Sequence, residues 1–320
     1  MKIVITGGTG FLGLRLARQL LAHGTATGPS GKKEPIEEMV LFDVVMPEKR
    51  PDGLDDRVKI VAGEISDAKA VGALIDTPNI GVYHLASVVS GGAEQDFELA
   101  MKVNLYGHLH LLEAIRKLGS KPRYLFSSSV AAYGSKAMPP KVTDQTKQTP
   151  QTTYGMTKAV GELLVNDYTR KGFLDGRTAR LPGVIVRPGK PNKAASSFMS
   201  AVIREPLGGV DYELPVPLDI QIPVAGYRTV VSALEALFEV NGAKLGDDRG
   251  VNLPNMTVTT AQMIEGLKEV AGDRKLGKID VKPDNFVMSI VTGWPTYLDA
   301  ARADALGLPK DKTFADIIKA

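Results

Sequence analysis

The sequence contains no cysteine among its 320 residues, and this absence removes several kinds of chemistry. Disulfide bonds, thiolate metal sites and cysteine nucleophiles are all excluded. Histidine is also scarce, and His108 and His110 fall two positions apart in a helical pattern, so their side chains project from different faces. We therefore expect no bound metal.

The sequence also lacks a long hydrophobic run and a strong excess of one charge. No segment approaches the roughly 20 uninterrupted apolar residues that span a bilayer, and Met1 leads directly into a strand pattern without a charged and apolar leader. The 39 basic residues nearly balance the 36 acidic ones, which is too even a mixture for a nucleic-acid-binding surface. These features predict a cytoplasmic protein with neither membrane nor nucleic acid as a partner.

The pattern that is present predicts a doubly wound α/β fold. Short β-branched runs alternate with longer helical patterns, and such runs are typical of parallel strands that helices bury on both faces. The polar, aperiodic segment 24–38 is expected to be a surface loop. Strands are expected at 2–6, 39–45, 58–62, 81–86, 122–129 and 178–186, and helices at 11–22, 67–76, 93–118 and 153–170.

After Gly189 the alternation gives way to isolated helical patterns with proline-containing connectors. We therefore divide the chain into a first domain of residues 1–189 and a smaller, mostly helical substrate cap of residues 190–320, with the option that C-terminal segments return to the first domain. In open α/β sheets a ligand lies at the carboxyl ends of the strands, where such a cap would cover it. The cap helices are expected near 194–205, 229–241, 259–271 and 310–319.

A glycine-rich turn, TGGTGFLG, joins the first expected strand to the first expected helix. Gly7 permits a tight turn, Gly10 lets backbone amides approach a pyrophosphate, and Gly13 lets the helix pack closely on the strand. The N-terminus of the helix favours the anion. This strand-turn-helix context predicts a dinucleotide site that also includes Phe11 and Leu12.

Asp43 stands at the end of the second expected strand, where a carboxylate can accept hydrogen bonds from the adenosine ribose. Because a carboxylate there repels a 2′-phosphate, we expect NAD rather than NADP. The alternative is that Asp43 is an ordinary turn residue at a strand end. Further candidates for cofactor binding follow the later strands: Glu64, Ile65, Leu85, Ala86, Ser87, Ser127, Pro182 and Val184.

A tyrosine and a lysine stand four residues apart in YGMTK, hence on one face of a helix. A free tyrosine titrates near pKa ~10, and a neighbouring ammonium stabilises the phenolate and lowers that value. Tyr154 is therefore a candidate general base, Lys158 a candidate ligand of the nicotinamide ribose, and Ser129 a candidate partner of the reacting hydroxyl. Such a pair is also common on surface helices, which is the alternative interpretation.

Together TGGTGFLG, HLAS, SSSVAAYG and YGMTK resemble the extended short-chain dehydrogenase/reductase family. The resemblance covers at least the first 190 residues and implies that Ser129, Tyr154 and Lys158 are catalytic. It also implies that Asn104 lies behind the nicotinamide. Members of the family commonly dimerise through the helices near 93–118 and 153–170, so we expect a homodimer.

Most extended members act on nucleotide sugars, but two features favour another substrate. The residues after the serine, from Val130 to Ala132, lack the acidic pair of dehydratases, and Leu181-Pro182-Gly183-Val184 replaces an Asn-containing turn of epimerases. Blocks such as RLPGVIVRPGKPNKAASSF and the C-terminal GWP resemble a sugar-acid dehydrogenase branch of the family. That resemblance implies NAD-dependent oxidation of the C2 hydroxyl of a four-carbon acid such as D-erythronate.

A sugar acid has a carboxylate but no nucleotide, so its pocket needs fixed donors. Arg187 can bind a carboxylate bidentately, and Asn192 and Lys193 can add donors. The alternative is that Arg180 and Arg187 only neutralise carboxylates within the fold. The remaining substrate candidates, for the polyol hydroxyls and the reacting group, are Ser87, Ser90, Ser129 and Tyr154.

Two other functions stay open at this point. One is a nucleotide-sugar epimerase or reductase of the same family with an unusual cap. The other is a non-catalytic dinucleotide sensor, although such sensors often lose the tyrosine that this sequence has at position 154.

Overall fold

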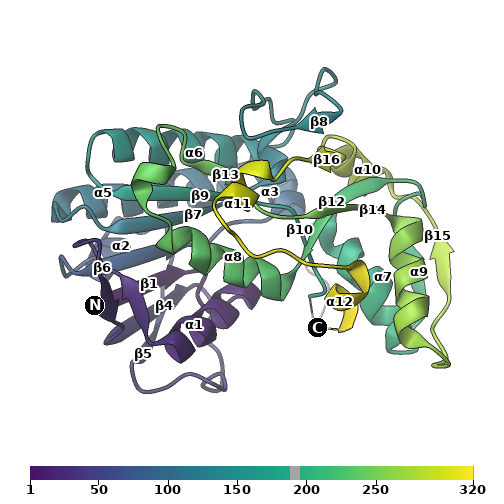
Figure 1. Cartoon of the computed structure of the whole chain (residues 1–320), viewed down its shortest axis with the longest axis horizontal. Coiled ribbons are helices and arrows are strands. Elements are labelled where there is room, and N and C mark those ends of the chain that lie inside the picture. The colour runs from purple at the N-terminus through teal and green to yellow at the C-terminus, as the bar shows by residue number, and fades with distance from the viewer. Residues whose placement is uncertain (188–194, 320) are drawn as a thin grey trace.

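The computed structural model describes residues 1–187 and 195–319. Its centre is a parallel sheet of seven strands in the order β13-β9-β7-β6-β1-β4-β5 (Figure 1). The order reverses at β1, so a crevice opens beyond the carboxyl ends of β1 and β6, as in doubly wound folds. The strands are β1 (Lys2–Thr6), β4 (Glu38–Asp43), β5 (Val58–Ala62), β6 (Ile80–His84), β7 (Arg123–Ser129), β9 (Asp175–Leu181) and β13 (Gly250–Asn252).

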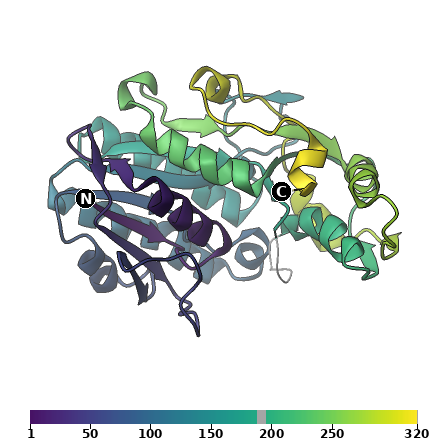
Figure 2. The same cartoon turned by 60° about the horizontal axis from the view of Figure 1, so that its bottom comes forward.

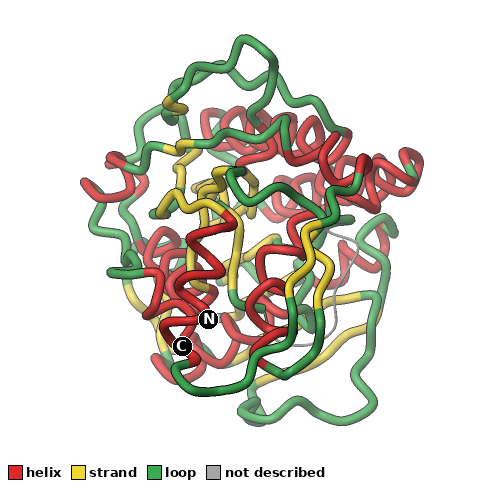
Figure 3. Tube along the Cα trace, turned by 90° about the vertical axis from the view of Figure 1, so that its right-hand side faces the viewer, coloured by secondary structure: helices red, strands yellow, loops and turns green. Residues whose placement is uncertain are grey.

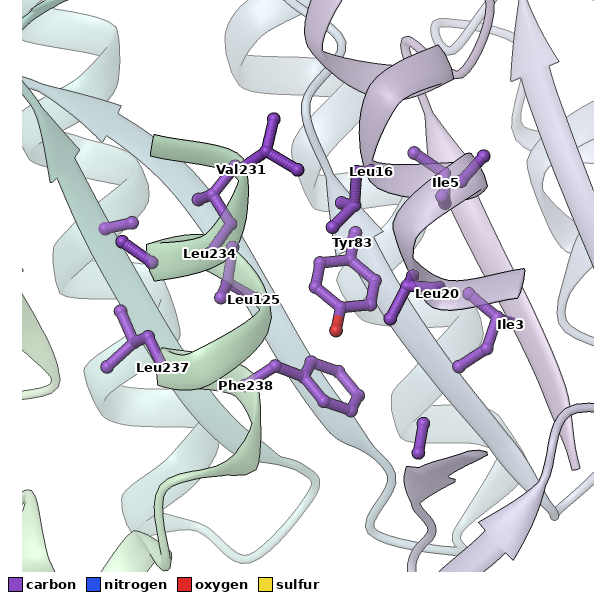
Figure 4. Close-up of a cluster of buried hydrophobic side chains, with 14 of the residues drawn as sticks. Ile3, Ile5, Leu16, Leu20, Tyr83, Leu125, Val231, Leu234, Leu237 and Phe238 are labelled. Atoms are coloured by element: carbon purple, nitrogen blue, oxygen red, sulfur yellow. The ribbon is translucent and has the colours of Figure 1, made fainter. Parts of the chain in front are cut away.

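Helices bury both faces of this sheet because successive strand side chains point to opposite faces. Ile3 and Ile5 of β1 pack with α1 (Phe11–His23) and α8 (Tyr227–Glu239), whereas Val4 belongs to the opposite core. Figure 4 shows Leu16 and Leu20 of α1 facing Leu234 and Phe238 of α8 around Tyr83. The opposite face is covered by α2 (Ala68–Leu74), α5 (Gly107–Leu118) and α6 (Thr153–Arg170).

The helix expected over 93–118 and the loop expected at 24–38 differ from the observed structure. The helix expected over 93–118 is interrupted: Asp96 accepts a hydrogen bond from the Leu99 amide and starts a new helix there. It forms α3 (Ser90–Gln95), α4 (Phe97–Ala100), the π-helical turn η1 (Met101–Tyr106) and then α5. The loop expected at 24–38 contains a hairpin of β2 (Thr25–Thr27) and β3 (Lys33–Pro35), whose short strands carry no long hydrophobic alternation.

The cap is built on a second, three-stranded sheet, β10-β12-β14. The strand expected to run to residue 186 ends at Leu181, and the chain resumes after Pro182 as β10 (Gly183–Ile185). Figure 3 views the molecule from the end that carries this cap. Its further elements are α7 (Phe198–Leu207), β11 (Tyr212–Leu214), β12 (Gln221–Gly226), β14 (Met256–Thr259), α9 (Thr260–Ala271), β15 (Ile279–Val281), α10 (Asn285–Val291) and α12 (Phe314–Lys319).

Part of the chain beyond residue 190 packs on the first layer. Strand β13 pairs with β9 at the edge of the large sheet, and α8 lies beside α1, as Figure 2 shows. The proposed boundary at residue 189 falls outside the described residues and stays a prediction. The small remaining elements are β8 (Lys141–Val142), β16 (Tyr297–Leu298) and α11 (Ala301–Ala305).

Candidate active site

A cavity of about 660 Å³ opens at the carboxyl ends of the central strands, between the large sheet and the cap. Nearly all of the site residues that were predicted from the sequence line this cavity. Asn104 is not among the lining residues, and Asn192 and Lys193 lie outside the described residues. The predicted residues that line it are Gly7, Gly10, Phe11, Leu12, Gly13, Asp43, Glu64, Ile65, Leu85, Ala86, Ser87, Ser90, Ser127, Ser129, Tyr154, Lys158, Pro182, Val184 and Arg187.

The glycine turn leaves no space for side chains at its first and last positions. Gly7 has a φ of +69°, and a Cβ there would lie 2.8 Å from the backbone nitrogen of Ala86. A Cβ on Gly13 would collide with the carbonyl oxygen of Gly7. Gly10 is the N-cap of α1, and no side chain caps that end, so the first amides face the cavity with the positive end of the helix dipole. The turn therefore fits the pyrophosphate of a dinucleotide.

Asp43 is held at the rim of the cavity by the backbone. Its carboxylate accepts hydrogen bonds from the Thr9 amide at 3.2 Å and the Val45 amide at 3.4 Å. Glu64, further along this rim, forms an ion pair with Lys102 at 2.9 Å, and this lysine holds the pKa of Glu64 below its ordinary value. Two carboxylates, those of Asp43 and Glu64, therefore line this part of the cavity.

Asn104 does not line the cavity but forms hydrogen bonds with a loop that does. Its Oδ1 accepts hydrogen bonds from the Val88 amide at 2.7 Å and the Ser87 hydroxyl at 3.2 Å. Its Nδ2 donates to the carbonyl oxygen of Val88 at 3.1 Å. The buried amide in η1 therefore fixes the loop that follows β6, and Ser87 lines the cavity from that loop.

The catalytic candidates come from β7 and from the first turns of α6. Thr152 caps that helix by accepting a hydrogen bond from the Gly155 amide at 3.0 Å, which sets the helix start just before Tyr154. The Lys158 ammonium donates to the carbonyl oxygen of Ser127 at 2.7 Å and lies 5.4 Å from the centre of the Tyr154 ring. Ser129 is hydrogen-bonded to the Tyr154 side chain. The three residues form one cluster at the cavity wall.

The electrostatics of this cluster differ from the sequence-based expectation. Burial lowers the pKa of Lys158 to about 7, against the attraction of Glu162 that raises it. Burial also raises the pKa of Tyr154, while the hydrogen bond with Ser129 and the positive charge of Arg187 lower it. The pKa of Tyr154 is therefore raised, and the lowering of this pKa by Lys158 stays a prediction.

Arg180 and Arg187 have different surroundings. Arg180 is buried and pairs with Glu162 through Nη2 at 2.7 Å and Nε at 2.8 Å, and it also donates to the Tyr133 hydroxyl. Arg187 lines the cavity and donates to the Ser196 hydroxyl at 3.3 Å. Within the described residues no carboxylate forms an ion pair with Arg187. The alternative of charge neutralisation within the fold therefore holds for Arg180 alone.

Several lining residues escaped the sequence reasoning. The only tryptophan of the chain, Trp294, lines the cavity and buries an indole nitrogen that has no hydrogen-bond partner among the described residues. The hydroxyl of Ser200 accepts a hydrogen bond from the Arg187 amide at 3.1 Å. Their sequence signal was weak, since no local motif tells which cap residues fold over the sheet. Other such residues are Ser196, Ser197, Met199 and Arg204.

Two absences hold for the described part of the chain. None of its helices has both the length and the hydropathy to cross a bilayer. No group of three or more histidine or acidic side chains is arranged to bind a metal ion among the same residues.

The chain matches the model of the NAD dependent epimerase/dehydratase family over residues 3–219. It therefore belongs to that family, the extended short-chain dehydrogenases/reductases. The chain is an enzyme, an oxidoreductase that uses a nicotinamide dinucleotide, as the glycine turn and the Ser129, Tyr154 and Lys158 cluster indicate.

Particular relatives resemble the whole chain. It is 49% identical to D-erythronate dehydrogenase of Cupriavidus necator, with 100% of this chain and 97% of that protein covered. It is 40% identical to D-erythronate dehydrogenase of Haemophilus influenzae, covering 100% and 98%. The crystal structure of the nucleoside-diphosphate-sugar epimerase from Agrobacterium tumefaciens superposes with a TM-score of 0.90 at 37% identity, covering 99% of this chain and 92% of that one.

Proposed function

We propose that this enzyme uses NAD to oxidise the C2 hydroxyl of a small sugar acid of the D-erythronate type to the 2-oxo acid. The observation that carries the proposal is the placement of Arg187, a partly buried cation without a carboxylate partner among the described residues, in the same cavity as Tyr154. The names of the two full-length relatives support the same substrate class.

Arg187 would bind the substrate carboxylate. Burial lowers the pKa of Arg187, because desolvation penalises an unpaired cation. A bound carboxylate would remove that penalty and would form charge-assisted hydrogen bonds in a partly dry cavity. Ser87 and Ser90, which also line the cavity, would contact the remaining hydroxyls of the acid.

Tyr154 would remove the proton of the C2 hydroxyl as a phenolate, and Ser129 would hold the same oxygen by a hydrogen bond. NAD, when bound, accepts the hydride from C2, which leaves a 2-oxo acid and one proton on the tyrosine. Lys158 would regain a full charge once ribose hydroxyls approach it, and an ammonium beside the ring would then favour the phenolate. Asp43 supports NAD over NADP as the cofactor.

The decisive experiment incubates the enzyme with NAD and either D-erythronate or a panel of UDP-sugars. Stoichiometric NADH release with the acid alone is the expected result. Isomerisation of a UDP-sugar without net NADH would replace the proposal by the epimerase alternative.

The Tyr154→Phe variant tests the non-catalytic alternative. We expect unchanged NAD binding and a loss of turnover of at least about 100-fold, since general base catalysis contributes of the order of 10² to 10⁴. Unchanged turnover in this variant would remove Tyr154 from the mechanism.

We also propose a homodimer formed through α4, η1 and α6. Apolar side chains stay exposed there, among them Phe97 at 53%, Tyr106 at 52% and Leu163 at 65% exposure. Burying such a patch is the usual reason for its presence on a protein surface. Light scattering should give twice the chain mass, and Leu163→Lys should shift it toward the monomer. The cytoplasmic location stays a prediction.

A further inference from the structure

We propose that a second pocket, at the amino-terminal edge of the large sheet, binds a small phosphate-type anion with two or more negative charges. This pocket, of about 450 Å³, lies where β7, β9 and β13 begin, whereas the active-site cavity lies where the central strands end. The two sites therefore occupy opposite edges of the same sheet. The proposal does not depend on the reaction proposed above.

Cations dominate this amino-terminal pocket. Three guanidinium groups surround the carboxylate of Asp175: Arg177 at 2.8 Å, Arg249 at 3.7 Å and Arg123 at 3.8 Å. Arg123, Arg249 and Lys121 line the pocket together with two carboxylates, those of Asp175 and Asp247, and Arg177 adds a fourth cation behind the lining. A concave surface with an excess of one sign concentrates ions of the other sign.

The guanidinium groups are held where solvent screens them little. The side chains of Arg123 and Arg249 are 8% and 13% exposed, and that of Arg177 is fully buried behind them. The Nε of Arg177 has no hydrogen-bond partner among the described residues. Burial lowers the pKa of Arg249, with the neighbouring Arg177 contributing in the same direction. An anion in the pocket would relieve this repulsion.

A purely structural role accounts for part of this cluster. Arg123 donates to the carbonyl oxygen of Phe238 at 2.6 Å, and Arg177 to that of Val240 at 2.7 Å, so both cap the C-terminus of α8. Arg249 donates to the carbonyl oxygen of Gly242 at 2.7 Å. Cations at the C-terminus of a helix are favourable by themselves. These contacts do not involve Lys121.

Lys121 is the residue that a capping role leaves unexplained. Its φ is +53°, a left-handed conformation that lysine rarely adopts, and proline follows at position 122. Within the described residues it forms neither an ion pair nor a side-chain hydrogen bond, although it lines the pocket. A backbone outlier that brings an unpaired cation to the rim of a cationic pocket points to a ligand.

The hairpin between α1 and β4 closes the pocket from one side. Gly28, Pro29 and Gly31 contribute to the lining, and the hairpin is fixed by a hydrogen bond from the Thr27 amide to Glu239 at 3.0 Å. Glycine, proline, alanine and polar residues make up the lining, and no aromatic side chain belongs to it among the described residues. The pocket therefore suits a compact anion and offers no stacking surface for a nucleobase.

The test is calorimetric titration of the full chain with inorganic phosphate. Saturating NAD is present throughout to fill the pyrophosphate site, and the ionic strength is held constant with chloride. We expect saturable phosphate binding that Lys121→Glu and Arg249→Gln each weaken at least about tenfold, which corresponds to about 1.4 kcal/mol. Lys275→Glu is the matched control, since it makes the same charge change at an exposed lysine of the cap and should alter affinity less than about twofold.

Either of two results would overturn the proposal. One is the absence of saturable phosphate binding by the wild-type protein. The other is binding that Lys121→Glu leaves unchanged, or that Lys275→Glu weakens equally, because the attraction would then come from the overall charge. Lys121 is exposed and makes no contact that the fold requires, so this variant decides the question even if Arg249→Gln does not fold.

Discussion

Arg180 and Arg187 lie on the same stretch of chain, yet their partners give them unlike roles. Arg180 points into the protein, where Glu162 takes two of its nitrogen donors. Arg187 points into the cavity, where a hydroxyl is its side-chain partner and no carboxylate of the described residues reaches it. The difference teaches that a buried arginine with a carboxylate partner belongs to the fold, whereas one without a partner is available to a ligand.

The largest expected effect comes from Arg180→Leu. This variant leaves Glu162 buried without its cation, and removing one partner of such a pair costs about 3–5 kcal/mol of unfolding free energy. Urea denaturation measures the loss. The double variant Arg180→Leu with Glu162→Gln should recover most of it, and failure of that recovery would mean that the contribution of Arg180 comes mainly from its other partners, Asp144 and the Tyr133 hydroxyl.

The second prediction concerns Arg187→Leu. Since the substrate carboxylate would lose its charge-assisted hydrogen bonds, we expect kcat/KM for the sugar acid to fall about 100-fold, or about 2.7 kcal/mol. The free energy of unfolding should change by less than about 1 kcal/mol, because no ion pair of the described residues is broken. If Arg187→Leu lost as much unfolding free energy as Arg180→Leu, Arg187 would also have a structural role, and the two arginines would not differ in function.

The smallest effect, counted per pH unit, is a pH dependence of stability that comes from Lys158, which also interacts with Glu162. Burial depresses the pKa of Lys158 from its ordinary value of 10.5 to about 7, against the opposing attraction of Glu162. Between these values the unfolded chain binds more protons than the folded one, so stability contributed by this group rises with pH from about 7 to about 10. The slope should approach about 1.4 kcal/mol per pH unit at most.

The measurement compares urea denaturation of the wild type and of Lys158→Met across that pH range. The difference between their stabilities should change with pH in the direction given. Parallel curves would show that Lys158 is not desolvated in solution.

The local parts of the fold and the site were predictable from sequence. Gly7 and Gly13 sit in a strand-turn-helix pattern whose spacing is a local property, and the spacing of Tyr154 and Lys158 is set by one helical turn. Both motifs lie at the same cavity because of the order of the strands in the sheet. The alternation of strands and helices in the sequence already restricts that order to a few possibilities. The prediction of the doubly wound fold was therefore confirmed.

The remaining features of the site could not be predicted from the sequence, because they depend on contacts between segments that are distant along the chain. Glu162 selects Arg180 and not Arg187 because β9 and α6 are neighbours only after folding. The pKa of Lys158 reflects its burial in the folded chain. Asn104 reaches Ser87 from a π-helical turn that no sequence motif marks. Trp294 arrives in the cavity from the far end of the chain.

The links between the two sheets limit how the cap can move. A single residue, Pro182, separates β9 of the large sheet from β10 of the cap. No residue separates β12 from α8, which begins at Tyr227 and packs along α1. Opening of the cap as a rigid body would therefore separate α8 from α1. We expect ligands to enter and leave the cavity with little movement of the cap as a whole.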